Sequence, residues 1–184
     1  MPRLPLRDPA EAPEAIREVI TSTPLSLLGM IAHAESAFEP WLRYSNTLLR
    51  RLELDPLLRE LAILQVAHLA GSEYEGTQHV PIAEAFGATA AQIRAIEADV
   101  PEPEGLGPDG CAVLDFTREV ILEGAAGEQA VAELIARLGE RQLVELLLVI
   151  GNYMGLARLI ATVGLEAMDP VVKLPGGADA LGPG

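Results

Sequence analysis

Residues 60–79, which read ELAILQVAHLAGSEYEGTQH, decide how this chain folds. An apolar run that contains Glu60 ends at Gly71, and polar residues at helical spacing follow it. Glu75 and His79 are four positions apart, so they share one face of a helix. Glu60 belongs to the preceding helix, which is apolar nearly all round, and a buried carboxylate needs a partner or a wet cavity. We therefore predict that Glu60 contacts His79.

The two helices of this stretch have well-marked ends. Asp55 before Pro56 is an N-cap followed by proline at the first helical position, and Gly71 is a typical C-terminal residue. Ser72 and Glu75 match the Ser-x-x-Glu pattern of a capping box. A helix cap is therefore a structural alternative to any chemical role for these two residues.

The rest of the chain predicts an all-α fold. Ala, Leu and Glu dominate the periodic segments, and no alternating run is bounded by hairpin signals. A chain of 184 residues with 49% hydrophobic content fits a single domain with about 8–9 helices. We expect helices near 12–21, 25–35, 38–51, 56–70, 73–86, 89–98, 109–124, 128–138 and 141–164. The predicted domain spans 11–170, between a flexible arm at 1–10 and a flexible tail at 171–184.

Composition excludes several classes of protein. The formal net charge is −14 and the basic residues are scattered, which disfavours a nucleic-acid surface. The single Cys111 excludes an intrachain disulfide and fits a reducing cytoplasm. The N-terminus lacks the apolar core of a signal peptide, and charged or polar residues interrupt the apolar segment 144–164, which predicts a core helix rather than a membrane span. The acidic segment 97–109 is rich in Pro and Gly and predicts an exposed loop of unassigned role.

At residues 60–79 the chain resembles the carboxymuconolactone decarboxylase family and its alkylhydroperoxidase D-like relatives, over roughly residues 20–168. In redox-active members a glutamate precedes a CxxC pair and a histidine. Glu60 matches that glutamate and His79 that histidine, whereas Ser72 and Glu75 stand at the two cysteine positions. A serine hydroxyl cannot replace a thiol in a disulfide cycle, so the resemblance points to the cysteine-free branch rather than to a peroxidase.

The resemblance implies a helical bundle that assembles as a homo-oligomer, a trimer or a hexamer. It also implies a proton-transfer enzyme, decarboxylase- or lyase-like, that acts on a small organic acid or lactone without a cofactor. Glu60, Glu75 and His79 are the catalytic candidates because histidine titrates near neutral pH and a carboxylate can orient its ring. Burial can raise the pKa of a carboxylic acid such as Glu75.

Three more residues are candidates for substrate binding: Ser72, Tyr74 and Arg158. Arg158 interrupts an apolar helix and could pair with an organic anion, although a salt bridge to a neighbouring helix is the preferred explanation. Tyr74 could line a pocket or simply pack. Four arginines between residues 43 and 59 are expected at the surface or at subunit contacts: Arg43, Arg50, Arg51 and Arg59.

Two alternatives to an enzyme remain open. A non-catalytic, oligomeric ligand-binding protein could have kept the fold after the thiol chemistry was lost. A metal site of Glu60, Glu75 and His79 is disfavoured, because di-iron bundles use paired Glu-x-x-His motifs and this spacing is one residue longer with no second copy.

Overall fold

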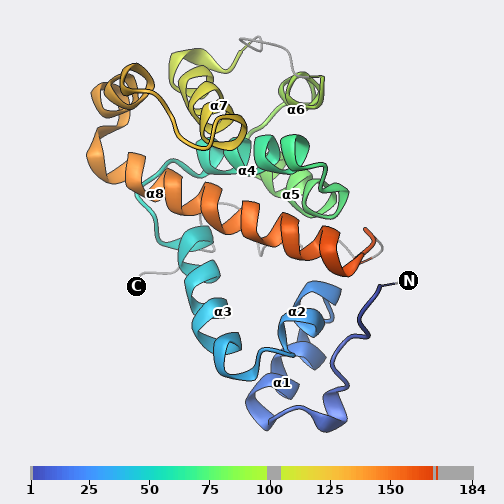
Figure 1. Ribbon diagram of the computed structural model, residues 1–184. Coiled ribbons are helices and arrows are strands. Elements are labelled where there is room, and N and C mark those ends of the chain that lie inside the picture. The colour runs from blue at the N-terminus through green and yellow to red at the C-terminus, as the bar shows by residue number, and fades with distance from the viewer. Residues whose placement is uncertain (1, 99–104, 168, 170–184) are drawn as a thin grey trace.

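The computed structural model describes residues 2–98, 105–167 and 169, and these residues form helices and no strand (Figure 1). The helices are η1 (Pro9–Glu11), α1 (Glu14–Ser22), α2 (Ser26–Ile31), α3 (Glu35–Arg50), α4 (Pro56–Ala70), α5 (Glu73–Ala85), α6 (Ala90–Glu97), α7 (Gly107–Leu122) and α8 (Glu128–Val163). The predicted all-α class is confirmed.

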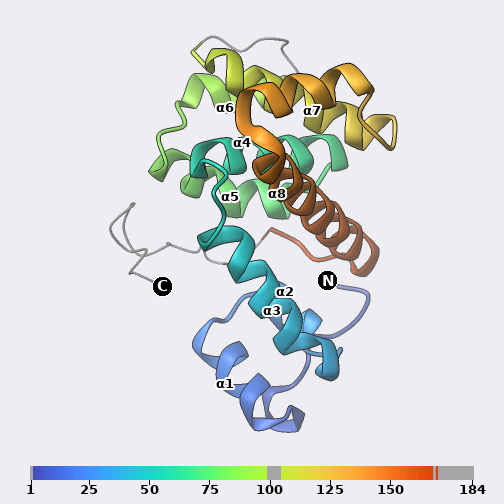
Figure 2. The ribbon, with the colours of Figure 1, turned by 90° about the vertical axis from the view of Figure 1, so that its left-hand side faces the viewer.

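Helix α4 is the centre of the bundle. It packs against α5, α6, α7 and α8, and its residues Leu61, Ala62, Ile63 and Val66 have no exposed surface. A helix surrounded on every side has no solvent face, which explains why the sequence of α4 is apolar all round. Helices α1 to α3 form a separate layer on one side of α8, as Figures 1 and 2 both show.

The predicted signals at the ends of α4 are confirmed. The Asp55 carboxylate accepts hydrogen bonds from the backbone N–H groups of Leu57 and Leu58 at 2.8 and 3.2 Å. Gly71 ends the helix in the left-handed conformation, with φ of 67°, which glycine adopts without steric cost. The tight turn sends α5 back along α4, so that Glu60 of α4 and His79 of α5 lie side by side.

Helix α8 contains the interruption that the sequence predicts near residue 139. Gly139 has φ of 85° and ψ of 166°, so the backbone is not helical there and the helix is kinked. The two predicted helices, 128–138 and 141–164, are the two arms of this kinked helix. The longer arm carries Leu146, Val149 and Ile150 into the core.

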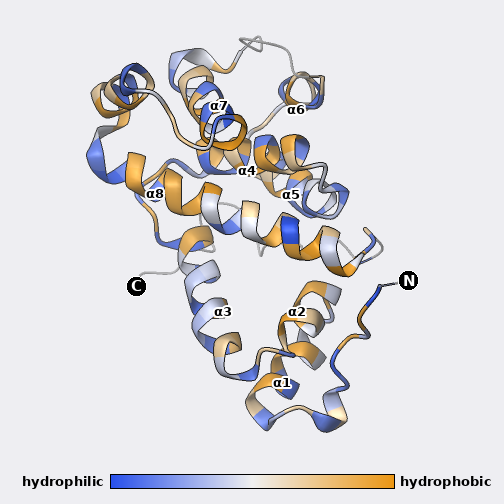
Figure 3. Cartoon of the chain, viewed as in Figure 1, coloured by the Kyte–Doolittle hydropathy of each residue, from blue (hydrophilic) through white to orange (hydrophobic). Residues whose placement is uncertain are grey.

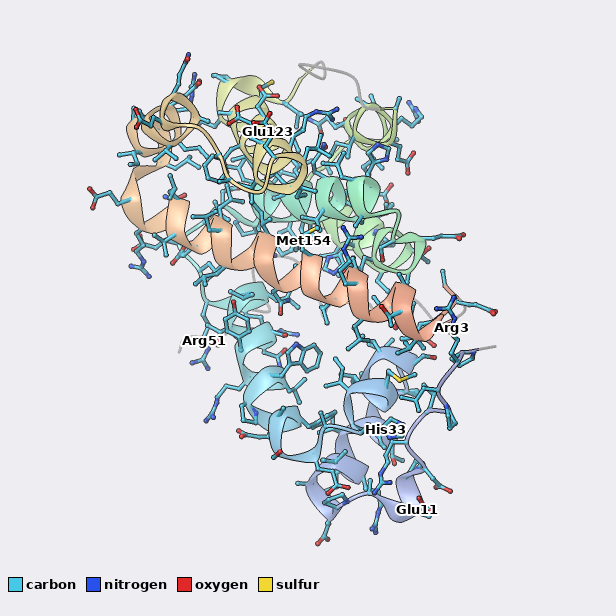
Figure 4. The ribbon with its side chains drawn as sticks, in the orientation of Figure 1. Arg3, Glu11, His33, Arg51, Glu123 and Met154 are labelled. Atoms are coloured by element: carbon cyan, nitrogen blue, oxygen red, sulfur yellow. The ribbon has the colours of Figure 1, made fainter. Side chains whose placement is uncertain are left out.

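The N-terminal arm contacts the rest of the protein. The backbone N–H of Arg3 donates to the Val163 carbonyl at 2.6 Å, and that of Arg7 donates to the Gly29 carbonyl at 3.0 Å. His33 Nε2 lies 2.8 Å from the Pro5 carbonyl oxygen. In Figure 4, Arg3 accordingly lies beside the C-terminal end of α8. The predicted tail, 171–184, lies outside the described residues.

Helix α8 is long and apolar enough to be a candidate membrane span by length and composition. In its most apolar window, however, 39% of the residues are buried inside the protein. It packs on α4 and α7, as a core helix does.

Candidate functional site

The predicted contact between Glu60 and His79 is present. Nδ1 of His79 lies 2.7 Å from Oε2 of Glu60. Glu60 has no exposed surface and His79 is 8% exposed. A carboxylate at this distance accepts the Nδ1 proton of a neutral imidazole, which leaves Nε2 as the ring nitrogen with a free lone pair.

Arg59 is buried with Glu60, which corrects the prediction that it lies at the surface. Its Nε donates to Oε1 of Glu60 at 2.9 Å, and its side chain is only 3% exposed. The guanidinium carbon lies 5.2 Å from the centre of the Phe86 ring, a cation–π contact. The prediction of a surface position for Arg59 rested on its charge alone. In α4, which other helices cover on all sides, even a charged side chain is buried.

The Glu60 carboxyl is held in its ionised form. Burial alone would raise its pKa, but the attraction and hydrogen bonds of His79 and Arg59 outweigh burial and lower the pKa below its ordinary value. Each Glu60 oxygen has its own partner, one on Arg59 and one on His79. Glu60 therefore fixes the His79 ring and stays anionic beneath it.

Glu75 is in the opposite state. It is 3% exposed, and neither carboxyl oxygen has a hydrogen-bond partner among the described residues. Burial raises its pKa to about 8, although the nearby Ser72 hydroxyl opposes the rise. At neutral pH the Glu75 carboxyl is therefore mostly protonated and can donate a hydrogen bond.

The capping-box alternative for Ser72 and Glu75 is wrong. Ser72 is the N-cap residue of α5, but its side chain makes no capping hydrogen bond. Its backbone N–H donates to the Ala67 carbonyl at 2.8 Å, so it does not need the Glu75 carboxylate. The tight turn after α4 supplies that backbone partner, and Glu75 is left free to face the interior.

Glu75 and His79 line a cavity of about 400 Å³ between α5, α8 and the layer of α1 to α3. Most of its lining is apolar, including Leu28, Leu42 and Trp41. Two polar atoms without hydrogen-bond partners also border it: Oγ of Ser45 from α3 and Nδ2 of Asn152 from α8. Buried polar atoms are rarely left unpaired in folded proteins, so this convergence indicates a binding site.

Tyr153 closes the cavity beside His79. The two rings meet edge to face, with centres 4.8 Å apart. Burial raises the pKa of the Tyr153 hydroxyl well above its ordinary value, and the charges of Glu60 and Glu75 raise it further. The phenol therefore stays neutral, and its ring restricts the rotation of His79.

Tyr74 has both predicted properties, since it packs in the core and lines the cavity. Its hydroxyl donates to the Asp169 carboxylate at 2.5 Å, and that carboxylate also accepts the backbone N–H and hydroxyl of Ser26. Burial, reinforced by Asp169, raises the pKa of the Tyr74 hydroxyl. Tyr74 thus ties the segment after α8 to α2 at the edge of the cavity.

Two predicted substrate-binding residues lie elsewhere. Arg158 is exposed and does not line the cavity, because its position on α8 faces away from α5. Ser72 is buried but borders a different cleft, between α5 and α6, together with His68. The structure therefore brings together Glu60, His79, Glu75 and Tyr74 of the six predicted site residues.

No group of three or more His, Cys, Asp or Glu side chains with metal-binding geometry occurs in the described part of the chain. Glu60 already uses both oxygens for protein partners, which leaves neither free for a metal ion. The charged neighbour Arg59 would also repel a cation. This donor set does not suit a metal.

Sequence reasoning missed Ser45, Asn152 and Tyr153. Asn152 and Tyr153 lie in the same apolar segment, 144–164, as Arg158. A polar amide inside such a segment could have indicated a buried polar site. Ser45 carried no such signal, because it lies in an amphipathic helix with many polar residues.

The fold and the site together define an all-helical bundle with a buried Glu60–His79 pair and a single cysteine. Residues 35–105 match the model of the Carboxymuconolactone decarboxylase family. The matched segment contains the motif from Glu60 to His79, in agreement with the predicted resemblance.

Two crystal structures share the fold. One is the core of an alkylhydroperoxidase AhpD, an uncharacterized peroxidase-related protein from Ralstonia eutropha JMP134, with 17% identity and a TM-score of 0.76 over 90% of this chain and 91% of that chain. The other is a protein of unknown function from Agrobacterium tumefaciens, related in its description to the antioxidant defence protein AhpD. It has 16% identity and a TM-score of 0.67 over 76% of this chain and 96% of that chain. No curated protein matches the sequence significantly.

Proposed function

We propose that the protein is a general acid–base enzyme that moves a proton at a carbon next to the carbonyl group of a small organic acid or lactone. The observation that carries this proposal is the pairing of His79 with an ionised Glu60 at 2.7 Å beside a cavity that also holds Glu75. Two titratable groups whose environments differ in this way are typical of acid–base sites.

In this mechanism the lone pair of His79 Nε2 takes the proton from carbon. The electron pair of the C–H bond moves toward the carbonyl oxygen, and the protonated Glu75 carboxyl stabilises the developing negative charge. Glu60 stabilises the imidazolium that forms, because it stays anionic at 2.7 Å from Nδ1. Return of the proton to carbon completes the cycle without an oxidant or a cofactor.

The same groups would serve a decarboxylation. There His79 starts protonated. The bond to a carboxylate breaks in place of a C–H bond, its electron pair moves toward the carbonyl oxygen as carbon dioxide leaves, and His79 then gives its proton to the carbon. The thiol cycle of the peroxidases is not part of the proposal, because Ser72 and Glu75 stand at the cysteine positions and Cys111 is alone.

A non-catalytic ligand-binding protein is the second candidate. The apolar lining and the volume of about 400 Å³ support it, since pockets for small molecules have this character. The pairing of Glu60 with His79 favours the enzyme, because binding alone does not require an oriented imidazole.

On a panel of carboxymuconolactone-type acids and simple lactones, replacing His79 with glutamine is expected to lower the turnover of any substrate that wild type accepts by about 10²–10⁴-fold, the usual contribution of a general acid–base residue. The measurement is carbon dioxide release or exchange of the proton beside the carbonyl with deuterated solvent. His68→Gln is the matched control, since His68 borders the other cleft. Equal rates for wild type and His79→Gln would remove His79 from the mechanism, and an inactive wild type would favour the ligand-binding alternative.

We further propose that the protein is a cytoplasmic homo-oligomer, a trimer or a hexamer, that associates through α8. Val144, Leu147 and Leu148 lie on one face of this helix and are 53%, 38% and 45% exposed. Figure 3 shows hydrophobic residues along much of α8. Exposed apolar patches of this kind are typical of protein interfaces.

Replacing Leu148 with glutamate is expected to shift the mass in solution from oligomer toward monomer, because a charge in an apolar interface is strongly unfavourable. Light scattering coupled to size-exclusion chromatography measures it. Glu133→Gln on the polar part of the same helix is the control. A wild type at the monomer mass would contradict the proposal.

A further inference from the structure

Three polar groups that border the cavity can donate hydrogen bonds. Asn152 Nδ2 and Ser45 Oγ have no partner, and the protonated Glu75 carboxyl is a donor as well. They come from α8, α3 and α5, so three sides of the cavity present donors to one space. Three unpaired donors that face one space are complementary to an oxygen that carries lone pairs and no hydrogen.

Few cationic side chains line the cavity. Among the described residues that line the cavity, Arg50 is the one with a permanent positive charge, and it is exposed at the end of α3. The buried Arg59 is already neutralised by Glu60 at 2.8 Å. Arg50 could pair with only one carboxylate of a ligand that carries two, so the second charge would enter an apolar space without a cation, which is costly.

The body of the ligand meets an apolar wall. Trp41 and Leu42 from α3, Leu28 from α2 and Leu156 from α8 line it. Such a wall favours an aliphatic or aromatic group through burial of apolar surface, with no requirement for further polar contacts.

We infer that the cavity takes an uncharged carbonyl compound with an apolar body, such as a lactone, ester or ketone, whose oxygen is bound by Ser45, Glu75 and Asn152. This inference rests on the proposed function, because it names the substrate class of the same site. It places the carbon next to the carbonyl beside His79 and disfavours substrates that carry two carboxylates.

Three matched probes test the inference: 4-phenylbutan-2-one, which has a neutral carbonyl; butylbenzene, which has none; and benzylsuccinate, which is a dianion at neutral pH. Calorimetry gives the dissociation constants. Trp41 is the only tryptophan of the chain, and its fluorescence reports whether each probe enters this cavity. We expect the ketone to bind at least about tenfold more tightly than either of the others, since one or two hydrogen bonds separate them.

Substitutions in the cavity test which residues bind the ketone oxygen. Glu75→Leu and Asn152→Leu are each expected to weaken ketone binding by about tenfold. Glu75→Gln keeps a donor and should bind the ketone nearly as wild type does. Thr77→Val is the control on the same helix, because Thr77 borders the other cleft. Equal binding of butylbenzene, equal or tighter binding of benzylsuccinate, or no binding of the ketone would each overturn the inference.

The two proposals can fail separately. If the ketone binds as expected but wild type does not exchange its protons with deuterated solvent, the proposed proton transfer is wrong and the inferred ligand class stands. If the protein instead turns over a dicarboxylate through His79, proton transfer stands and the ligand class is wrong. His79→Gln should bind the ketone and fail to exchange it.

Discussion

Replacing Glu60 with leucine is expected to destabilise the protein by about 3–5 kcal/mol, because it leaves a buried guanidinium without its counter-charge. Arg59 is 3% exposed and its Nε and Nη2 lie 2.9 and 2.8 Å from Glu60 Oε1. The remaining contact with Phe86, at 5.2 Å, cannot replace a carboxylate. Urea denaturation of wild type and variant gives the difference in the free energy of unfolding.

The double variant Arg59→Met/Glu60→Leu tests the physical reason. Removing both charges should restore much of the lost stability, since a buried ion pair exchanged for apolar residues of similar size is often close to neutral. Glu133→Gln serves as the control for an exposed ion pair, in which Glu133 meets Arg137 at 2.9 Å. Its effect should stay below about 1 kcal/mol. A single Glu60→Leu variant as stable as wild type would show that Arg59 has another partner.

Replacing Glu75 with glutamine is expected to stabilise the protein at neutral pH and above. The Glu75 carboxyl has a pKa of about 8 in the folded state against an ordinary value of 4.5, so the folded protein holds this proton more tightly than the unfolded chain. Stability therefore falls as pH rises from about 4.5 to about 8, while the unfolded chain loses the proton and the folded state retains it. Glutamine cannot ionise and removes this loss.

At pH 7 the difference between Glu75→Gln and wild type should be about 3 kcal/mol, from roughly 1.4 kcal/mol for each pH unit between the unfolded pKa of 4.5 and pH 7. Near pH 4 the difference should vanish, because the carboxyl is protonated in both states. The measurement is the free energy of unfolding at several pH values. Glu73→Gln is the control on the same turn of α5, since Glu73 is exposed. A pH-independent difference would show that Glu75 is not buried in its neutral form.

Glu60 and Glu75 carry the same chemical group but differ in protonation because their surroundings differ. Glu60 and Glu75 are both almost fully buried, at 0% and 3% exposure. Glu60 meets Arg59 and His79 and stays ionised, whereas Glu75 meets no cation and stays protonated. Packing alone therefore produces an anion that orients the His79 ring and a neutral acid that faces the cavity.

Local signals in the sequence predicted the helices well. Both ends of α4 match the prediction of 56–70, because Asp55, Pro56 and Gly71 act within one turn of the backbone. Thr89 likewise forms a full capping box with Gln92. The capping-box pattern was wrong for Ser72 and Glu75. There the tight turn after α4 already gives the Ser72 backbone N–H a hydrogen-bond partner.

The pairing of Glu60 with His79 could also be predicted from the sequence. A carboxylate in a fully apolar helix must find a partner, and the short turn at Gly71 places α5 directly against α4. Arg59 was misassigned because a charged residue next to Glu60 carries no sign of whether it is buried. Only the packing of α4 against α5 to α8 encloses it.

The sequence by itself therefore determined the helical class, the family motif and the oriented imidazole, since all three depend on residues close together in the chain. The tertiary structure alone decided the cavity. Ser45, Glu75 and Asn152 lie on α3, α5 and α8, and only the packing of α8 between the two helical layers brings their donors together. It also turned Arg158 outward, because one face of a helix can meet the cavity while the opposite face meets solvent.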